Sequence, residues 1–229
     1  MSEYVYGKNS FFEALNNSRI TKAYLLNKDI VDELKKKKIP FEIVDRKTLD
    51  KMSKFGNHQG YLAEVKEFKL STVDEMIKQS NGFIVVLDGL KDVHNLGAII
   101  RTCDCAGVDG IIYKSHNSVK VNDTVAKVAC GALEYVKIAE VTNLVNTLKD
   151  LKKKGYWVVG TDASANDLYT QIKYDMNVVL IIGSEGDGIS RLVKQECDFM
   201  IKLPMNGHVT SLNASVAAGI LIYNVINSR

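Results

Sequence analysis

Long apolar segments are missing from the sequence, which contains no run close to the roughly 18 apolar residues that a membrane-spanning helix requires. The first ten residues, MSEYVYGKNS, also lack the apolar region of a signal peptide. We therefore expect a cytoplasmic protein that does not bind a membrane. With 229 residues, 46% of them hydrophobic, the chain is long enough to bury a sizeable core in one or two domains.

Metal-binding patterns are missing as well. The 4 cysteines include no Cys-x-x-Cys pair, and the 4 histidines show neither a His-Glu-x-x-His motif nor a similar spacing. Cys103 and Cys105 alone are a weak metal signal, since buried reduced thiols are a commoner use of cysteine. We expect no metal site.

Neither of two common phosphate-binding patterns occurs. The turn GSEGDG, from Gly183 to Gly188, has the order GxxGxG instead of the dinucleotide-binding GxGxxG, and no Gly-Lys-Ser/Thr sequence is present. A ligand of this turn should therefore lack a pyrophosphate. Backbone N–H and C=O groups in a glycine turn can still face a purine or an amino-acid moiety, although the turn by itself is a weak signal.

Charge is distributed unevenly along the chain. Residues 1–66 contain 13 Lys and Arg against 9 Asp and Glu, whereas residues 81–229 contain 15 of each kind. The N-terminal part is thus the better candidate for contact with a polyanion. Its densest basic run is Lys35 to Lys38. Such a run is more often a solvated helix end that the helix dipole favours, so charge alone does not establish contact with nucleic acid.

Helical and extended patterns alternate throughout, which predicts two α/β regions. In the first region we predict helices over 7–15, 29–38 and 48–54 and strands over 23–26, 41–44 and 61–65. Residues 67–81 are polar, with a helix-like part over 73–79, and are predicted to form a linker.

The second region, residues 82–229, opens with FIVVL, a continuous apolar run typical of a strand buried on both faces. We predict further strands over 110–113, 135–139, 157–160, 178–182 and 199–203, and helices over 96–106, 121–130, 143–154, 189–196 and from 212. This order indicates a mostly parallel sheet covered by helices. Ligands bind beyond the carboxyl ends of such strands, where the polar turns of this sequence lie.

The first polar turn contains DVHNLGAIIR. Asn95 is placed to cap the helix that follows, and His94, Gly97 and Arg101, at spacings i, i+3 and i+7, share one helix face. A purely structural alternative stays open, in which Asn95 is only a cap and Arg101 only pairs with a carboxylate such as Asp104.

The stretch Leu203 to Tyr223, LPMNGHVTSLNASVAAGILIY, joins a polar loop to a long apolar helix. Ser211 is placed to cap this helix, and both Ser211 and Asn213 are expected in a first turn whose unpaired N–H groups favour anions. The first half of the helix has almost no bulky side chains, so a ligand or another backbone can come close. Tight helix packing explains this feature equally well.

Three blocks together resemble the three signature motifs of the SpoU family of RNA ribose 2′-O-methyltransferases, within the SPOUT superfamily. They are LDGLKDVHNLGAIIRTCDCAG from Leu87, VLIIGSEGDGISRL from Val179 and IKLPMNGHVTSLNASVAAGI from Ile201. GKNSFFEAL and HQGYLAEV resemble the ribosomal-protein-like substrate-binding domain of the family. The whole pattern is most similar to the branch that methylates a guanosine ribose in bacterial large-subunit (23S) ribosomal RNA.

This resemblance implies a fold and its partners. Residues 82–229 would form an α/β-knot domain, a trefoil-knotted parallel sheet in which the chain around Gly183 to Leu212 is threaded. Residues 1–66 would form a small ribosomal-protein-like α/β domain that binds the RNA substrate. The resemblance also implies S-adenosylmethionine as methyl donor, no metal, ribosomal RNA as partner, and a homodimer through the knot region.

The resemblance further implies functional positions. The active-site positions are Asn95, Arg101, Glu185, Ser211 and Asn213, and the methyl-donor contacts are Thr161, Gly183, Leu203 and Leu212. We expect Arg101 to hold the RNA phosphate or ribose and to favour the developing alkoxide. Its guanidinium, with a pKa above about 12, is a poor general base.

In the N-terminal region, Lys8 and Asn9 begin a helix and are placed to meet an RNA phosphate, while His58 and Gln59 precede a strand and could read a base edge. Simple capping and turning by these residues is an open alternative.

Two departures from the family pattern are small. Val93 stands where many members have proline, and Ala214 where valine is common. Three other functions stay open: a transfer-RNA methyltransferase, a ribosomal-RNA enzyme that confers antibiotic resistance, and a non-catalytic RNA-binding or ribosome-assembly factor.

Overall fold

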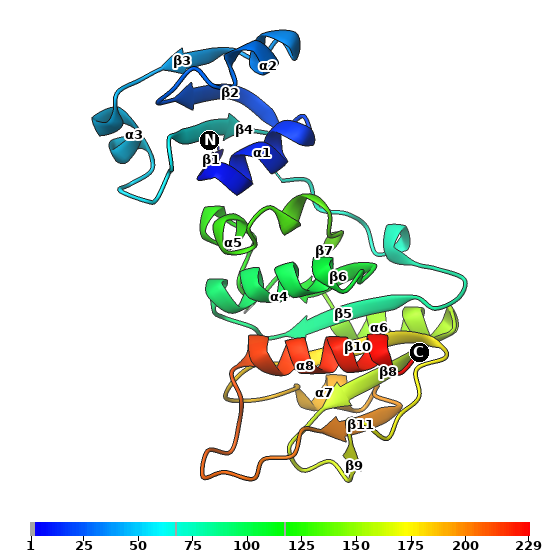
Figure 1. Ribbon diagram of the computed structural model, residues 1–229. Coiled ribbons are helices and arrows are strands. Elements are labelled where there is room, and N and C mark those ends of the chain that lie inside the picture. Colours follow the sequence, from blue (N-terminus) through cyan, green and yellow to red (C-terminus); the bar gives the residue numbers. More distant parts are fainter. Residues whose placement is uncertain (1–2, 67, 117) are drawn as a thin grey trace. The chain divides into compact units, whose positions relative to one another are not determined.

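The computed structural model of the protein describes residues 3–66, 68–116 and 118–229. The chain forms two compact units (Figure 1). The first contains the described residues up to Lys69 together with Val121–Tyr135, and the second contains Leu70–Lys120 and Val136–Arg229. No helix among the described residues is both long and apolar enough to cross a membrane.

The first unit is built on a four-stranded sheet with the order β1-β4-β2-β3, in which β2 and β3 are parallel and the other pairs are antiparallel. Its elements are β1 (Glu3–Tyr6), α1 (Lys8–Asn16), β2 (Ile20–Leu25), α2 (Val31–Lys36), β3 (Phe41–Ile43), α3 (Arg46–Met52), β4 (Tyr61–Val65), α5 (Asp123–Val128) and the 3-10 helix η2 (Ala132–Glu134).

The two faces of this sheet have separate cores because successive residues of a strand point to opposite faces. Leu25 packs in one cluster with Phe11 of α1 and Leu34 of α2. The preceding residue, Tyr24, packs in another cluster with Leu49 of α3. The predicted helices of the first region therefore cover both faces of its sheet.

Residues 121–135 pack against the first unit, where α5 contacts β1. Arg19 forms an ion pair with Glu134, and the hydroxyl of Tyr135 donates a hydrogen bond to Glu13. Burial raises the pKa of Glu134 although the neighbouring Arg19 favours its ionised form. The sequence predicts this segment within the C-terminal region, so the contacts of the folded chain divide the sequence differently from the predicted boundaries.

The second unit contains a seven-stranded, fully parallel sheet with the order β7-β6-β5-β10-β8-β11-β9. Its elements are η1 (Asp74–Met76), β5 (Phe83–Asp88), α4 (Val93–Cys105), β6 (Gly110–Lys114), β7 (Ile138–Val141), α6 (Leu144–Lys153), β8 (Tyr156–Thr161), β9 (Asp167–Leu168), β10 (Asn177–Gly183), α7 (Arg191–Lys194), β11 (Phe199–Lys202) and α8 (Ala214–Asn227).

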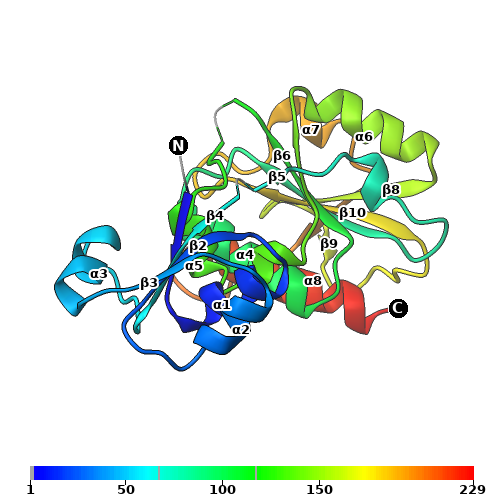
Figure 2. The same ribbon diagram turned by 90° about the horizontal axis from the view of Figure 1, so that it is seen from above.

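Helices cover both faces of this sheet, with α6 and α7 on one face and α4 and α8 on the other (Figure 2). All residues of β5 are buried, as are those of β10 up to Ile182, which explains why their sequences are continuous apolar runs. On α6, Leu144, Leu148 and Leu151 recur at helical spacing and pack into the core against the sheet.

Two predicted helix starts are wrong, and in both a neighbouring side chain acts as the cap. Asp92 caps α4, since its Oδ1 accepts a hydrogen bond from the His94 N–H at 2.9 Å, and this leaves Asn95 inside the first turn. Asn213 caps α8, so Ser211 lies before the helix instead of at its cap. In each helix, the side chain that was expected to accept hydrogen bonds from the first backbone N–H groups is therefore not the cap.

Some short elements were not predicted. Strands β1 and β9 have four and two residues, too few for a clear period-two pattern. The strand predicted over 135–139 begins later, at Ile138, because η2 occupies Ala132–Glu134 and Tyr135 follows it as the C-cap.

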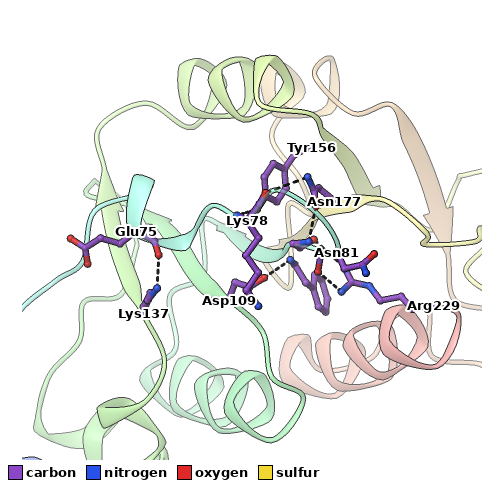
Figure 3. Close-up of polar contacts among 10 residues, drawn as sticks. Glu75, Lys78, Asn81, Asp109, Lys137, Tyr156, Asn177 and Arg229 are labelled. Carbon is purple, nitrogen blue, oxygen red and sulfur yellow. Dashed lines mark hydrogen bonds and ion pairs between the residues drawn. The ribbon is translucent and has the colours of Figure 1, made fainter.

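The segment predicted as a linker is fixed to the second unit from Leu70 onward. Met76 is 1% exposed and belongs to the hydrophobic core between the sheet and α6. Figure 3 shows further contacts at the amino ends of the strands, where the Lys78 N–H donates to the hydroxyl of Tyr156 at 3.0 Å. The Gly82 N–H donates to Oδ1 of Asn177 at 2.7 Å.

Asn177→Ala should lower the free energy of unfolding by about 1–3 kcal/mol, because it leaves the buried Gly82 N–H without an acceptor. Urea denaturation followed by circular dichroism measures this change. Lys153→Ala is the matched control, since Lys153 pairs with Asp150 on the exposed surface and such pairs contribute about 0–1 kcal/mol. Equal stability of Asn177→Ala and the wild type would contradict the expectation.

Candidate active site

A cavity of about 330 Å³ lies at the carboxyl ends of three parallel strands. Thr161 ends β8, Gly183 ends β10 and Lys202 ends β11, and all three line the cavity. Parallel strands end at one edge of a sheet, so side chains and turns that are distant in sequence meet there. The other lining residues come from the turn after β10 and from the loop between β11 and α8.

The turn after β10 is tightly closed. The N–H groups of Ser184 and Gly188 each donate to the carbonyl oxygen of the other, at 3.0 and 3.1 Å. A Cβ atom at Gly183 would lie 2.3 Å from the Gly188 carbonyl carbon and 2.5 Å from the Ile189 nitrogen, so only glycine fits at this position. The closed turn leaves Glu185 at its exposed tip.

Three polar side chains converge beside the cavity. Oε1 of Glu185 accepts hydrogen bonds from Nδ2 of Asn95 at 2.7 Å and from Nδ2 of Asn213 at 2.9 Å. Nδ2 of Asn213 also donates to Oδ1 of Asn95 at 2.9 Å. The three residues come from α4, the turn after β10 and the cap of α8, so the cluster joins three separate segments.

Helix capping fixes the orientation of one amide in this cluster. Oδ1 of Asn213 accepts hydrogen bonds from the N–H groups of Ser215 at 3.0 Å and Val216 at 3.3 Å. Because the oxygen is used at the helix start, the Nδ2 group must face the carboxylate of Glu185. Asn95 is only 4% exposed, which favours a single arrangement of its side chain.

The electrostatics of the cavity favour a cationic ligand. Its lining includes the carboxylates of Asp162, Glu185 and Asp187 and, among the described residues that line it, one cation, Lys202. The ion pair with Lys194, helped by hydrogen bonds from Ser164, lowers the pKa of Asp162 to about 2. Asp162 therefore stays ionised throughout the physiological pH range.

The structure brings most of the predicted site residues together. Thr161, Gly183, Leu203, Ser211 and Leu212 all line the cavity. The hydroxyl of Thr161 donates to the Ile181 carbonyl at 3.3 Å. These positions are where a ligand in the cavity would touch the chain.

Arg101 is the exception among the predicted active-site residues. It lies on the exposed surface of α4, six residues after Asn95 and thus about 9 Å farther along the helix axis. Like Asn95 and Asn213 it does not line the cavity, but unlike them it is not one of the side chains that converge on Oε1 of Glu185.

Sequence reasoning missed several acidic residues of the site. Asp162 directly follows β8, and Asp88 is the last residue of β5, where its Oδ2 accepts a hydrogen bond from the Ser190 N–H at 2.7 Å. Because ligands bind beyond the carboxyl ends of parallel strands, the positions of both residues could have identified them as part of the site. A second cavity of about 620 Å³, lined among others by Asp88, Lys91 and Asp187, shares the turn after β10 with the first.

In the first unit, the residues that were expected to contact RNA differ in their exposure and in their hydrogen bonds. Lys8 and Asn9 are exposed in the first turn of α1. His58 is 6% exposed, and its Nδ1 accepts from the Gly60 N–H at 2.9 Å while Nε2 lies 3.1 Å from Oδ1 of Asp50. Oε1 of Gln59 accepts from the Lys8 N–H at 2.9 Å. Both ring nitrogens of His58 are thus occupied within the protein, which does not fit a base-reading role.

No group of three or more His, Cys, Asp or Glu residues in the described parts of the chain could hold a metal ion. Cys103 is buried and Cys197 is partly buried, whereas Cys105 and Cys130 are exposed, unlike the buried thiols that the sequence suggests. Burial raises the pKa of the Cys197 thiol to about 11.

Comparisons with known proteins identify the family of the chain. The sequence model of the SpoU rRNA methylase family matches residues 82–223, and that of the RNA 2′-O ribose methyltransferase substrate-binding domain matches residues 4–71. The chain is 43% identical over 240 aligned positions to YacO of Bacillus subtilis (strain 168), which carries the provisional name of a TrmH family tRNA/rRNA methyltransferase. That alignment covers 99% of this chain and 96% of YacO.

Two solved structures share the fold. The SpoU methyltransferase AviRb from Streptomyces viridochromogenes, in complex with AdoMet, has a TM-score of 0.85 and 20% identity over 98% of this chain and 89% of its own. The AdoMet-bound rRNA methyltransferase from Sinorhizobium meliloti has a TM-score of 0.87 and 23% identity, over 99% and 87% of the two chains.

The predicted fold class, a SpoU α/β domain with a parallel sheet preceded by a small substrate-binding domain, is therefore confirmed. With a family match over residues 82–223 and 43% identity across nearly the whole length of a relative, the chain belongs to the SpoU (TrmH) family of RNA methyltransferases.

Proposed function

We propose that this protein transfers a methyl group from S-adenosylmethionine to the ribose 2′-hydroxyl of an RNA nucleotide. The observation that carries the proposal is the convergence of Asn95, Glu185 and Asn213 beside the cavity at the strand ends. Family membership supports the reaction class, and the names of relatives include both transfer RNA and ribosomal RNA.

The cavity suits the proposed methyl donor. S-Adenosylmethionine carries a sulfonium, an ammonium and a carboxylate group and is therefore a cation overall. Asp162 is paired with Lys194, but the carboxylates of Glu185 and Asp187 still outnumber Lys202, the cation among the described lining residues, and so favour a positive ligand. Its volume of about 330 Å³ lies within the range of small-molecule sites, roughly 300–1,000 Å³. Thr161, Gly183, Leu203 and Leu212 are the residues that would hold the donor. When bound, it supplies an electrophilic methyl group whose transfer needs no metal.

The polar cluster would place the ribose for the reaction. A 2′-hydroxyl must be aligned with the methyl group and must lose a proton although it is a very weak acid. Asn95 and Asn213 hold one oxygen of Glu185 through two N–H groups, which leaves Oε2 for a substrate hydroxyl. Ser211, in the loop before α8, would position that loop over the nucleotide.

Arg101 would bind the RNA from the exposed surface of α4. Its planar guanidinium can donate two parallel hydrogen bonds to a phosphate or ribose and can stabilise the negative charge that develops on the 2′-oxygen. This role needs substrate to extend beyond the cavity, which an RNA chain does.

We propose a homodimer through the second unit. Helix α8 exposes Val216, Ile220 and Tyr223 by 50%, 38% and 44%, and their spacing places them in one stripe along the helix. The opposite side of α8 is buried against its own unit. An apolar stripe of this kind is suited to packing against the same stripe of a second copy.

The proposed substrate is a guanosine in large-subunit ribosomal RNA. It would bind to the first unit, and the second unit, Leu70–Lys120 with Val136–Arg229, would carry the methyltransferase site. The presence of the substrate-binding domain, matched over residues 4–71, supports a folded RNA target. Lys8 and Asn9, exposed at the start of α1, are placed to meet its phosphates. The protein is expected in the cytoplasm, where this RNA occurs.

Incubation of the purified protein with tritiated methyl donor should label large-subunit ribosomal RNA taken from cells that lack the modification. The label should resist alkaline cleavage at one position, because a methylated 2′-oxygen cannot attack the neighbouring phosphate. Total transfer RNA is the parallel sample. Label in transfer RNA alone would contradict the proposed substrate, and no label in either RNA would contradict the proposed activity.

Asn213→Ser should lower turnover about a hundredfold, because it removes the donor to Glu185 and loosens the cluster. Serine still caps α8, so the melting temperature should change little. Asn213→Ala is the comparison variant, which loses the donor and the cap and should be both inactive and less stable. Turnover of Asn213→Ser equal to the wild type would exclude a positioning role for the amide.

Arg101→Lys should lower turnover at least tenfold while the affinity for the methyl donor, measured by calorimetry, is unchanged. Lysine keeps the charge but cannot form the two parallel hydrogen bonds of a guanidinium. Arg191→Lys, the same substitution at an exposed position of α7, is the matched control and should leave turnover unchanged. Nearly full turnover of Arg101→Lys with unchanged RNA affinity would show that the fork geometry is not used.

A further inference from the structure

The loop after α3 presents an exposed aromatic ring in an unusual backbone conformation. Phe55 is 83% exposed, the largest exposed fraction among the large hydrophobic residues that the structure describes. Its φ angle is +59°, and that of the preceding Lys54 is +51°. Left-handed backbone is rare for a bulky residue with a Cβ atom, so the surrounding structure must hold the ring in place.

The end of α3 explains why the ring points outward. The Phe55 N–H donates to the Asp50 carbonyl oxygen at 2.6 Å, which is the long hydrogen bond of a Schellman motif. In this motif the residue at the position of Phe55 commonly packs back on the residue at the position of Asp50. Here that residue is polar, and its carboxylate is bonded to His58. The motif therefore closes without apolar packing for the ring.

The loop is held rigidly around Phe55. The buried ring of His58 joins Asp50 to the Gly60 N–H. The hydroxyl of Ser53 lies 3.2 Å from the Asp50 carbonyl and 3.3 Å from the Gly56 carbonyl. A Cβ at Gly56 would lie 2.4 Å from the ring of Tyr6, so the loop is also packed closely on β1. The buried His58 is thus a positioning residue for the exposed ring.

Basic side chains share this end of the unit. Arg46, Lys47 and Lys51 of α3 and the adjoining Lys54 are all exposed. None of the four forms an ion pair with another described residue. An exposed aromatic ring among cations is the combination that binds unpaired nucleic acid, with the ring stacking on a base and the cations holding phosphates.

We propose that Phe55 is a stacking platform for an unpaired base of the RNA substrate and that Lys51 and Lys54 hold the phosphates next to that base. The proposal rests on the RNA substrate proposed above and adds the side chain that recognises a single-stranded part of it. Because every base has a π face, Phe55 selects an unstacked nucleotide by its accessibility instead of by its identity.

Binding of the full-length protein to an unmodified large-subunit ribosomal RNA transcript tests this proposal. Phe55→Ala and Phe55→Gly should each weaken binding about 5- to 150-fold, the range for losing one stacked base. Phe55→Tyr, which keeps the ring, should bind within about twofold of the wild type. Phe55→Gly should also resist urea better than Phe55→Ala, because glycine adopts a positive φ without strain.

The salt dependence separates stacking from charge. Lys51→Ala should reduce the slope of log affinity against log salt concentration by about 1, whereas Phe55→Ala should leave this slope unchanged. A Phe55→Trp variant in the Trp157→Phe background should lose fluorescence when the transcript binds, since the new ring would be stacked on a base.

Two results would overturn the proposal. The first is wild-type affinity of both Phe55→Ala and Phe55→Gly for the transcript. That result would show that the ring does not contact this RNA and would favour a protein as its partner. The second is an equal loss in Phe55→Tyr and Phe55→Ala, which would exclude stacking. If the wild-type protein neither binds nor methylates the transcript, the proposed function itself fails. If it methylates the transcript and either of these two results is found, only the stacking role fails.

Discussion

The insertion of β10 between β5 and β8 is the constraint on which the site depends. β10 follows β5 by about ninety residues, yet pairs with it in parallel from Val178 opposite Phe83 to Gly183 opposite Asp88. The central position buries β10 almost completely and brings the turn after Gly183 to the middle of the sheet edge. From there Glu185 reaches α4 and the cap of α8 together, which neither edge of the sheet would allow.

The polar cluster uses groups that also build the fold. Asn213 caps α8 with its oxygen and binds Glu185 with its nitrogen, so the helix start and the site are fixed by the same amide. His58 plays a comparable double role in the first unit, where it is buried and shapes an exposed loop. Substitutions at such residues change stability and function at once, which is why the cap-preserving serine at position 213 is informative.

Sequence patterns predicted the helices and strands well where burial requires apolar residues at regular spacing. They failed at helix starts, where several polar side chains could each form the cap. The apolar run at β5 and the leucines of α6 gave correct elements because packing against the sheet requires those spacings. The starts of α4 and α8 were misplaced because each has more than one possible capping residue within three positions, and only the folded geometry selects Asp92 and Asn213. The docking of residues 121–135 on the first unit is a long-range contact that no local pattern reports.

The sequence by itself determined the family, the parallel α/β class and most residues around the cavity, because these follow from ordered motifs and from periodic burial. Tertiary structure decided which of those residues meet. It joined Asn95, Glu185 and Asn213 through one carboxylate oxygen, placed Arg101 outside the cavity and turned Phe55 outward while it buried His58. Spacing in a sequence fixes the direction of a side chain only within its own helix or strand, whereas contacts between segments depend on how the whole chain packs.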